Sequence, residues 1–333
     1  MNRPETAMNL SLGLTTSSSI ERTKWISGMA DALGLHGVWI GEDIGSVQEI
    51  FTTTSLALLG TRRVNVGIGV TSPFIRNVTT IARAAIALSE IAPKRFRLGL
   101  GVGGLRDLAS MGIQIKKPTE MMRKTVRLLR VIWTSRGIPV SEGDLKIGGY
   151  RPQFGGKEEI PIFMGVRGPK LLAQAAELAD GLILSGPKKY VEESIKLVLS
   201  RRTTLGLSSK FCFVLWTPTI MVLERSDLEL VKKIVAIVAA DTPDSVLEMA
   251  GIAKDEVDEV RTDIAKHGIK DAAKNISSNL VEQFCISGDA GGICESLRHH
   301  SKLGVDEVVF GPPYGRDPKK AITEVAETWV RTE

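Results

Sequence analysis

Short apolar runs alternate along the chain with longer segments in which apolar residues recur every three or four positions. The runs are expected to be buried strands, because they are brief and apolar on both faces. They cover residues 10–14, 38–41, 64–70, 96–102, 162–164, 181–184, 211–222 and 305–310. The longer segments predict helices, the first one starting after a capping box of Ser18 and Glu21, and another beginning at a Thr119 cap. The predicted helices cover residues up to 33, then 48–59, 79–91, 105–111, 119–135, 169–179 and 190–205, with a last helix from about Asp317.

This alternation makes eight strand–helix units, the number that closes an α/β (β/α)8 TIM barrel. We therefore predict a single TIM-barrel domain over residues 1–333, with insertions at 137–160 and 227–284. The first insertion is rich in Gly, Pro and polar residues, and the second has a helical pattern with mixed charges. A doubly wound sheet is the alternative if one or two strands are misassigned.

Composition narrows the class of protein. The chain of 333 residues is 43% hydrophobic and 24% charged, which is ordinary for a globular protein with a large core. Its net charge of +5 is scattered through helices, and aromatic residues reach only 5%, so the pattern favours anionic small molecules over nucleic acid. No run approaches the ~18 apolar residues of a membrane span, and the first ten residues lack an apolar signal core, so we expect a cytoplasmic protein. The cysteines, Cys212, Cys285 and Cys294, are expected to be reduced and mostly buried.

The strand ends hold two candidate ligand loops. Gly99, Gly101 and Gly104 form G-x-G-x-x-G between a strand and a helix, which is either a dinucleotide fingerprint or a set of small residues that lets barrel strands and a ligand approach closely. Residues 165–169, Gly-Val-Arg-Gly-Pro, combine glycines with a proline suited to a helix start and with Arg167. Free amides at such a start bind anions, so this loop predicts a phosphate site; a plain strand-to-helix turn is the alternative.

Other chemistry is sparse. The sequence contains no G-x-S-x-G, H-E-x-x-H, C-x-x-C or P-loop motif, and His267, His299 and His300 are expected at the surface. No metal site is predicted. We therefore expect an organic cofactor to supply the chemistry.

Several blocks resemble one known family. Residues 67–91 (GIGVTSPFIRNVTTIARAAIALSEI), the LGLGVG block that follows, residues 163–185 (FMGVRGPKLLAQAAELADGLILS) and residues 305–322 (VDEVVFGPPYGRDPKKAI) are similar to the bacterial-luciferase-like flavin and deazaflavin enzymes. Within that family the chain resembles most the coenzyme F420-dependent 5,10-methylenetetrahydromethanopterin reductases, from Leu10 to about Glu327.

The resemblance implies a TIM barrel that binds coenzyme F420 at the ends of its strands. Gly69–Thr71 match the bulge behind the deazaflavin ring, with a cis Gly69–Val70 peptide, and the loop at 165–168 matches the phosphate loop. The implied cofactor-binding residues are Gly69, Val70, Thr71, Gly103, Gly165, Val166, Arg167, Gly168, Ser185 and Gly311.

The chain departs from the reductases after three of its strands. Gly13 and Gly104 stand where the reductases carry acids, and Glu42 and Asp43 stand where they carry Asp and His. Either the pterin is handled differently or the substrate is another molecule. Glu42 and Asp43 are thus the candidate catalytic acid/base or orienting groups; a solvated helix-capping pair is the alternative.

The predicted function is a cytoplasmic F420-dependent oxidoreductase that transfers a hydride between the reduced deazaflavin and a carbon substrate, such as methylene-tetrahydromethanopterin or a related tetrahydropterin. We expect a small pterin-like partner and a homo-oligomer, and neither nucleic acid nor membrane. The alternatives are an FMN-dependent luciferase-like monooxygenase and a non-catalytic deazaflavin-binding protein.

Overall fold

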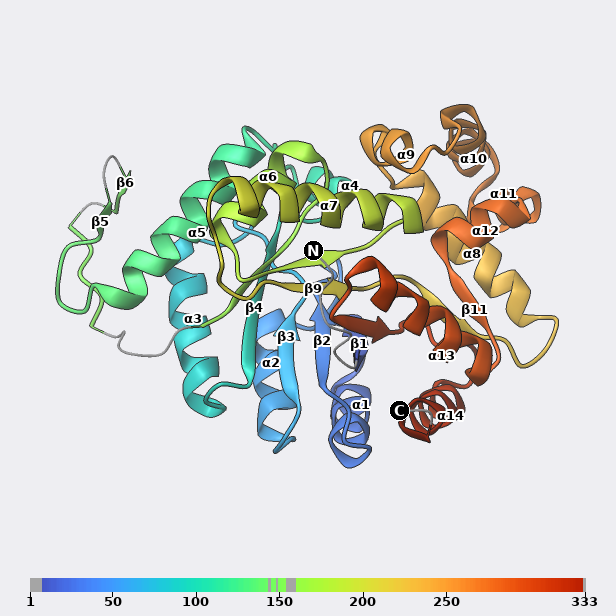
Figure 1. Ribbon diagram of the computed structural model, residues 1–333, viewed down its shortest axis with the longest axis horizontal. Helices are drawn as coiled ribbons and strands as arrows, with labels where there is room; N and C mark the ends of the chain where they lie inside the picture. Colours follow the sequence, from blue (N-terminus) through green and yellow to red (C-terminus); the bar gives the residue numbers. More distant parts are fainter. Residues whose placement is uncertain (1–7, 143–144, 148, 154–159, 332–333) are drawn as a thin grey trace. The chain divides into compact units, whose positions relative to one another are not determined.

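Eight parallel strands close into a barrel in the order β1-β12-β9-β8-β7-β4-β3-β2 (Figure 1). The computed structural model describes residues 8–142, 145–147, 149–153 and 160–331. The barrel strands are β1 (Asn9–Thr15), β2 (Gly37–Gly41), β3 (Asn65–Ile68), β4 (Phe96–Gly101), β7 (Ile162–Gly165), β8 (Gly181–Leu184), β9 (Cys212–Leu215) and β12 (Glu307–Phe310). The closed barrel confirms the predicted (β/α)8 fold and excludes the doubly wound sheet.

Helices follow the strands along the chain. They are α1 (Ile20–Ala32), α2 (Ile50–Leu59), α3 (Val78–Ile91), α4 (Leu105–Ser110), α5 (Pro118–Thr134), α6 (Pro169–Leu178), α7 (Lys188–Thr204), α8 (Asp227–Ala240), α9 (Asp244–Ala250), α10 (Lys254–His267), α11 (Ile269–Ala272), α12 (Ser278–Phe284), α13 (Ala290–His299) and α14 (Pro318–Arg331), with 3-10 turns η1 (Ala273–Asn275) and η2 (His300–Leu303). Two small sheets pair β5 (Ser141–Glu142) with β6 (Leu145–Lys146), and β10 (Thr219–Met221) with β11 (Ile286–Gly288).

The chain divides into two compact units. The N-terminal unit comprises Leu12–Ile183 and Ser200–Cys212, and the C-terminal unit comprises Met1–Ser11, Leu184–Leu199 and Phe213–Glu333. The prediction of one domain with insertions at 137–160 and 227–284 stays a prediction, and residues 143–144, 148 and 154–159 of the first insertion lie outside the described part of the chain.

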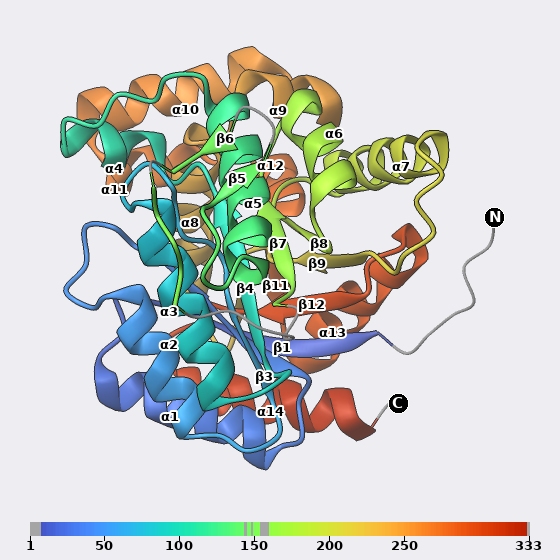
Figure 2. The same ribbon diagram turned by 90° about the vertical axis from the view of Figure 1, so that its left-hand side faces the viewer.

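In the N-terminal unit, strands β2, β3, β4 and β7 lie side by side, and helices α1, α2, α3, α5 and α6 pack against one another in that order (Figure 2). The strands are buried almost throughout, which explains their continuous apolar sequence. Helices α1, α2 and α3 are capped by local side chains, whereas α5 and α6 are not. Ser19, rather than the predicted Ser18, caps α1 by accepting from the amide of Arg22, and α5 begins after Lys117 with a left-handed φ of 49° instead of at a Thr119 cap.

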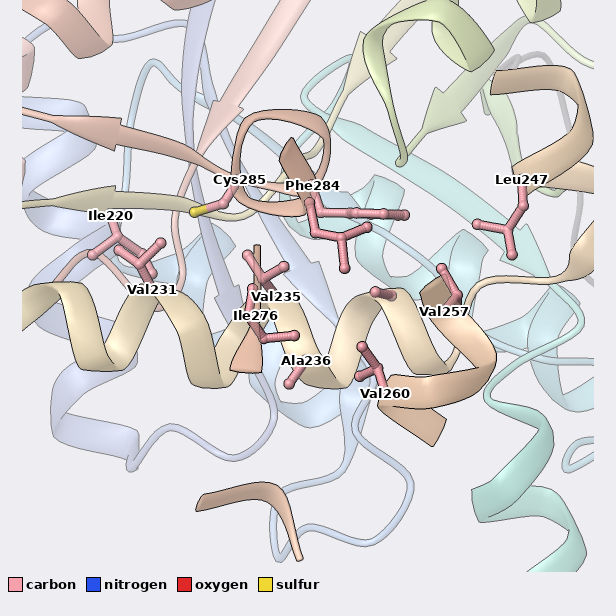
Figure 3. Packing of buried hydrophobic residues seen from close by; sticks show 12 residues of the cluster. Ile220, Val231, Val235, Ala236, Leu247, Val257, Val260, Ile276, Phe284 and Cys285 are labelled. Carbon is pink, nitrogen blue, oxygen red and sulfur yellow. The ribbon is translucent and has the colours of Figure 1, made fainter. Parts of the chain in front are cut away.

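In the C-terminal unit, helices α8 to α12 fill residues 227–284 and enclose a core of their own (Figures 1 and 3). Val231 and Val235 of α8 belong to this core together with Ile276 and Phe284. Cys285 and Cys294 are buried as expected, and Cys212 is half-buried.

The predicted seventh strand, residues 211–222, is wrong as a single element. It consists of β9 in the barrel and β10, which pairs with β11 instead. Pro218 stands between them and has no amide to donate, so a continuous ladder ends there. Its carbonyl oxygen accepts from the amide of Ile286 at 2.9 Å, which starts the second pairing.

Candidate functional site

The chain bulges where β3 ends. Gly69 donates its amide to the carbonyl of Ile40 at 2.8 Å, and the amide of Thr71 reaches the carbonyl of Gly99 at 3.0 Å. The Gly69–Val70 peptide is cis, which confirms that prediction. Hydrogen bonds to both neighbouring strands therefore hold residues 69–71 at the strand ends, where barrel enzymes place their chemistry.

Three glycines on β4 and β7 make room for the end of β3 and for the bulge. A β-carbon on Gly101 would lie 2.5 Å from Val70 Cγ2, and one on Gly165 would lie 2.6 Å from Val70 Cγ1. A β-carbon on Gly99 would collide with the carbonyl oxygen of Ile68. The glycines of the G-x-G-x-x-G segment thus let strands and bulge approach, as the packing interpretation predicts, and the dinucleotide-fold interpretation is wrong because the sheet is a closed barrel.

Glu42, directly after β2, is held by a bidentate ion pair with Arg76. Arg76 Nη2 lies 2.5 Å from Glu42 Oε1, and Nη1 lies 2.8 Å from Oε2. Thr71 Oγ1 also donates to Glu42 Oε2 at 2.7 Å. The two charged side chains are only 7% and 16% exposed. The network holds the Glu42 carboxylate in one orientation beside the bulge, because charge-assisted bidentate hydrogen bonds fix the plane of a carboxylate.

The helix-capping alternative for Glu42 and Asp43 is wrong. Helix α2 is capped by Glu49, whose carboxylate accepts from the amide of Thr52 at 2.9 Å. Asp43 is exposed, and its backbone exchanges hydrogen bonds with Thr16 Oγ1. Glu42 and Asp43 therefore occupy different environments: the Glu42 carboxylate is largely buried and held by its partners, whereas Asp43 faces solvent.

The loop after β7 starts helix α6 as predicted. Gly168 has a positive φ of 82°, Pro169 opens the helix, and no side chain caps its first amides. Arg167 is half-buried and makes neither a hydrogen bond nor an ion pair with any residue that the structure describes. This arrangement suits an anion, since helix-start amides and a guanidinium without a partner both attract negative charge.

The loop after β4 is built on glycines as well. Gly103 has a φ of 93°, and a β-carbon there would press on Ser72 and Leu108 at 3.3 to 3.4 Å. At Gly104 a β-carbon would lie 2.7 Å from Asp107 Oδ2. The carboxylate of Asp107 in α4 therefore lies over the position whose own acid is missing, a residue that sequence reasoning did not single out.

Two predicted residues belong to the C-terminal unit. Ser185 follows β8 and is half-buried. Gly311 follows β12 with a φ of 70°, and its carbonyl accepts from Trp216 Nε1 at 2.7 Å. A β-carbon on Gly311 would collide with the ring of Tyr314, so this turn requires glycine.

Histidines and metals add nothing at these strand ends. His267 and His299 are exposed as expected, whereas His300 is half-buried, and this burial lowers the pKa of its imidazole. Within the described ranges no group of three His, Cys, Asp or Glu side chains is arranged to hold a metal ion.

Comparison with known proteins identifies the family of the chain. Residues 7–307 match the family described as luciferase-like monooxygenase. The chain belongs to that family. It is 30% identical over 304 residues to the 5,10-methylenetetrahydromethanopterin reductase of Archaeoglobus fulgidus, covering 88% of this chain and 90% of the relative. It is 25% identical over 325 residues to the reductase of the same name from Methanolobus tindarius, covering 95% and 97%.

A solved structure supports the fold. The coenzyme F420-dependent tetrahydromethanopterin reductase from Methanopyrus kandleri superimposes with a TM-score of 0.82 at 20% identity, covering 98% of this chain and 99% of that one. The family and the fold expected from the sequence are therefore confirmed. No helix in the described part of this family member has the length and hydrophobicity needed to cross a membrane.

Proposed function

We propose that this chain is a coenzyme F420-dependent oxidoreductase that transfers a hydride between the deazaflavin and the one-carbon group of a methylene-tetrahydropterin, such as methylenetetrahydromethanopterin. The observation that carries the proposal is the 30% identity to the Archaeoglobus fulgidus reductase over 88% of the chain. Relatives named as other F420-dependent enzymes support the cofactor predicted from the sequence.

The bulge at residues 69–71 fits a flat ring system. Val70 is half-exposed, and its methyl groups pack closely against Gly101 and Gly165, which have no side chains of their own. Together with Gly103, these residues would form a firm apolar support for one face of the deazaflavin ring. When bound, the cofactor supplies the hydride.

The loop at residues 165–168 would hold the phosphate of the cofactor. Its helix-start amides and the guanidinium of Arg167 offer donors that no described residue uses. Val166 is 5% exposed and anchors the loop in the core. Ser185 and Gly311 are further proposed cofactor contacts, because they directly follow β8 and β12.

Glu42 would orient the substrate or hold a proton for it. Its carboxylate is held in place by Arg76 and Thr71. Arg76 is therefore a positioning residue for Glu42. Asp43, being exposed and at the adjacent position, is the weaker candidate of the proposed catalytic pair.

The direct test is to titrate purified protein with F420 and, separately, with FMN, and to follow each by absorbance. Binding of F420, followed by stopped-flow oxidation of the reduced cofactor upon mixing with methylenetetrahydromethanopterin, is the expected result. Binding of FMN alone would favour the monooxygenase alternative. Binding of F420 without turnover on any tetrahydropterin would favour the non-catalytic one.

Two isosteric variants test the catalytic residue. Glu42→Gln should slow hydride transfer by about 10²-fold or more, the usual contribution of a positioned acid or base, with F420 affinity changed much less. Asp43→Asn is the matched control and should keep the wild-type rate. A Glu42→Gln protein with an unchanged rate would show that this acid has a structural role only.

A further inference from the structure

A second concave surface lies in the C-terminal unit, on the helical segment 227–284. Helix α8 forms one wall, and α11 with η1 forms the other, since both pack on α8. The hollow has a volume of about 690 Å³, and its charged residues are Arg225, Lys232, Lys233, Lys270, Lys274 and Glu229. We call it the basic groove; it shares no residue with the candidate site described above.

The groove concentrates positive charge. Five cations face one carboxylate there, whereas the whole chain of 333 residues carries a net charge of only +5. Arg225, Lys232, Lys233 and Lys270 have no carboxylate at ion-pair distance among the described residues. Lys274 alone is paired, with Asp271 at 2.6 Å.

The same segment neutralises its cations elsewhere. On α10, Lys254 lies 2.5 Å from Asp258, and Arg261 reaches both Asp258 at 2.7 Å and Asp244 at 2.9 Å. Counter-charges are thus placed close to Lys254 and Arg261, whereas around the five cations of the groove only Glu229 and Asp271 are acidic. Like charges that share a hollow raise the local potential and attract an anion from solution.

The lining also defines the kind of anion. Lysines provide point charges that suit phosphate oxygens, and the volume is that of a small-molecule site. Among the residues that the structure describes, no aromatic side chain lines the groove, so the bases of a nucleic acid would have no ring to stack on. Leu228, which is 46% exposed, adds a short apolar patch to the wall.

We propose that the basic groove is a binding site for a small polyanion that carries two or more phosphate groups. The site is separate from the hydride-transfer site and does not depend on the proposed function. Its residues come from α8 and the two residues before it on one side and from α11 with η1 on the other, so the ligand would lie between the two walls.

The test uses inorganic triphosphate as the probe, measured by isothermal titration calorimetry with the full chain at low ionic strength. Wild type should bind one equivalent, and binding should weaken as salt is raised because exposed charges are screened. The variant Lys232→Gln/Lys233→Gln should bind at least tenfold more weakly. Arg225→Gln/Lys270→Gln, which alters both walls, provides a second variant with the same expected loss.

The matched control is Lys24→Gln/Lys319→Gln, which removes two positive charges from exposed positions on α1 and α14. It should bind like wild type. Failure of wild type to bind, or an equal loss in the control, would overturn the proposal. So would tighter binding of citrate or of a thymidine oligonucleotide than of triphosphate, because the groove would then select carboxylates or a nucleic acid.

Discussion

The ion pair between Arg76 and Glu42 should contribute measurably to stability, and a double-mutant cycle can isolate its share. The variants are Arg76→Met, Glu42→Gln and the combination of both. Arg76→Met leaves the carboxylate of Glu42, 7% exposed, without its bidentate partner. Breaking a buried pair from one side costs ~3–5 kcal/mol, and because Arg76 keeps 16% exposure we expect about 3 kcal/mol.

The double variant should lose less than the two single variants added together. With both charges gone, no uncompensated charge remains, so the interaction energy of the cycle should be about 2 kcal/mol. The free energies of unfolding come from urea titrations of the four proteins at pH 7. The contacts that Arg76 makes with Thr71 and with the Phe51 ring, 5.3 Å away, are lost in both halves of the cycle and cancel.

The same arginine provides an internal control. Arg76 Nη2 also lies 3.0 Å from Glu49 Oε1, but Glu49 is 46% exposed. Its cycle, with Glu49→Gln preserving the cap on α2, should give about 0.5 kcal/mol, as exposed pairs do. Equal interaction energies for Glu42 and Glu49, or strict additivity for Glu42, would refute the reasoning that burial makes the first pair the stronger one.

Three further outcomes are expected. Arg167→Ala should weaken binding of intact F420 roughly tenfold more than binding of its ring system without phosphate, and an equal loss for both ligands would exclude the phosphate contact. Asp31→Asn should lower the free energy of unfolding at pH 7. Although burial raises the pKa of Asp31, hydrogen bonds from the backbone amides of residues 62–64 lower it overall. The stability that these bonds contribute is therefore lost as the pH falls through the folded pKa, so wild type and variant should reach the same free energy of unfolding in acid. Gly165→Ala should lower the free energy of unfolding, measured by urea titration, by about 1–3 kcal/mol, because the added methyl group overpacks against Val70. It should also weaken F420 binding, followed by absorbance. Unchanged stability would mean that the bulge moves aside without cost.

The sequence predicts the barrel well because its strands are buried on both faces and their helices are amphipathic. The prediction fails where a single residue, such as a proline, determines where a strand ends. Pro218 divides residues 211–222 into two strands in different sheets, although the run is apolar except for Thr217 and Thr219 beside the proline. The short strand β11 has only three residues and a partner 67 positions earlier, so no local pattern reveals it.

The candidate site, too, is predicted only in part by the sequence. The sequence places Glu42 and Arg76 after neighbouring strands, yet their pairing joins residues 34 apart and needs the fold. The unpaired state of Arg167 and the carboxylate of Asp107 over Gly104 are likewise properties of packing. The glycine spacing at 99–104 is visible in the sequence, but only the structure shows that Gly101 accommodates the bulge and Gly99 the end of β3.

The glycines around Val70 differ in how they could change during divergence of the family. At position 165 an added β-carbon would meet only Val70 Cγ1 closely, at 2.6 Å, whereas Ile183 Cβ and Val70 Cβ would lie at ordinary contact distances of 3.7 and 3.8 Å. A mutation of Val70 to alanine would therefore permit an alanine at 165, a compensatory pair. At position 101 the β-carbon would also lie 2.7 Å from the carbonyl oxygen of Gly165, which no side-chain replacement removes. Positions 70 and 165 can thus evolve together, whereas position 101 has no permissive partner and must stay glycine.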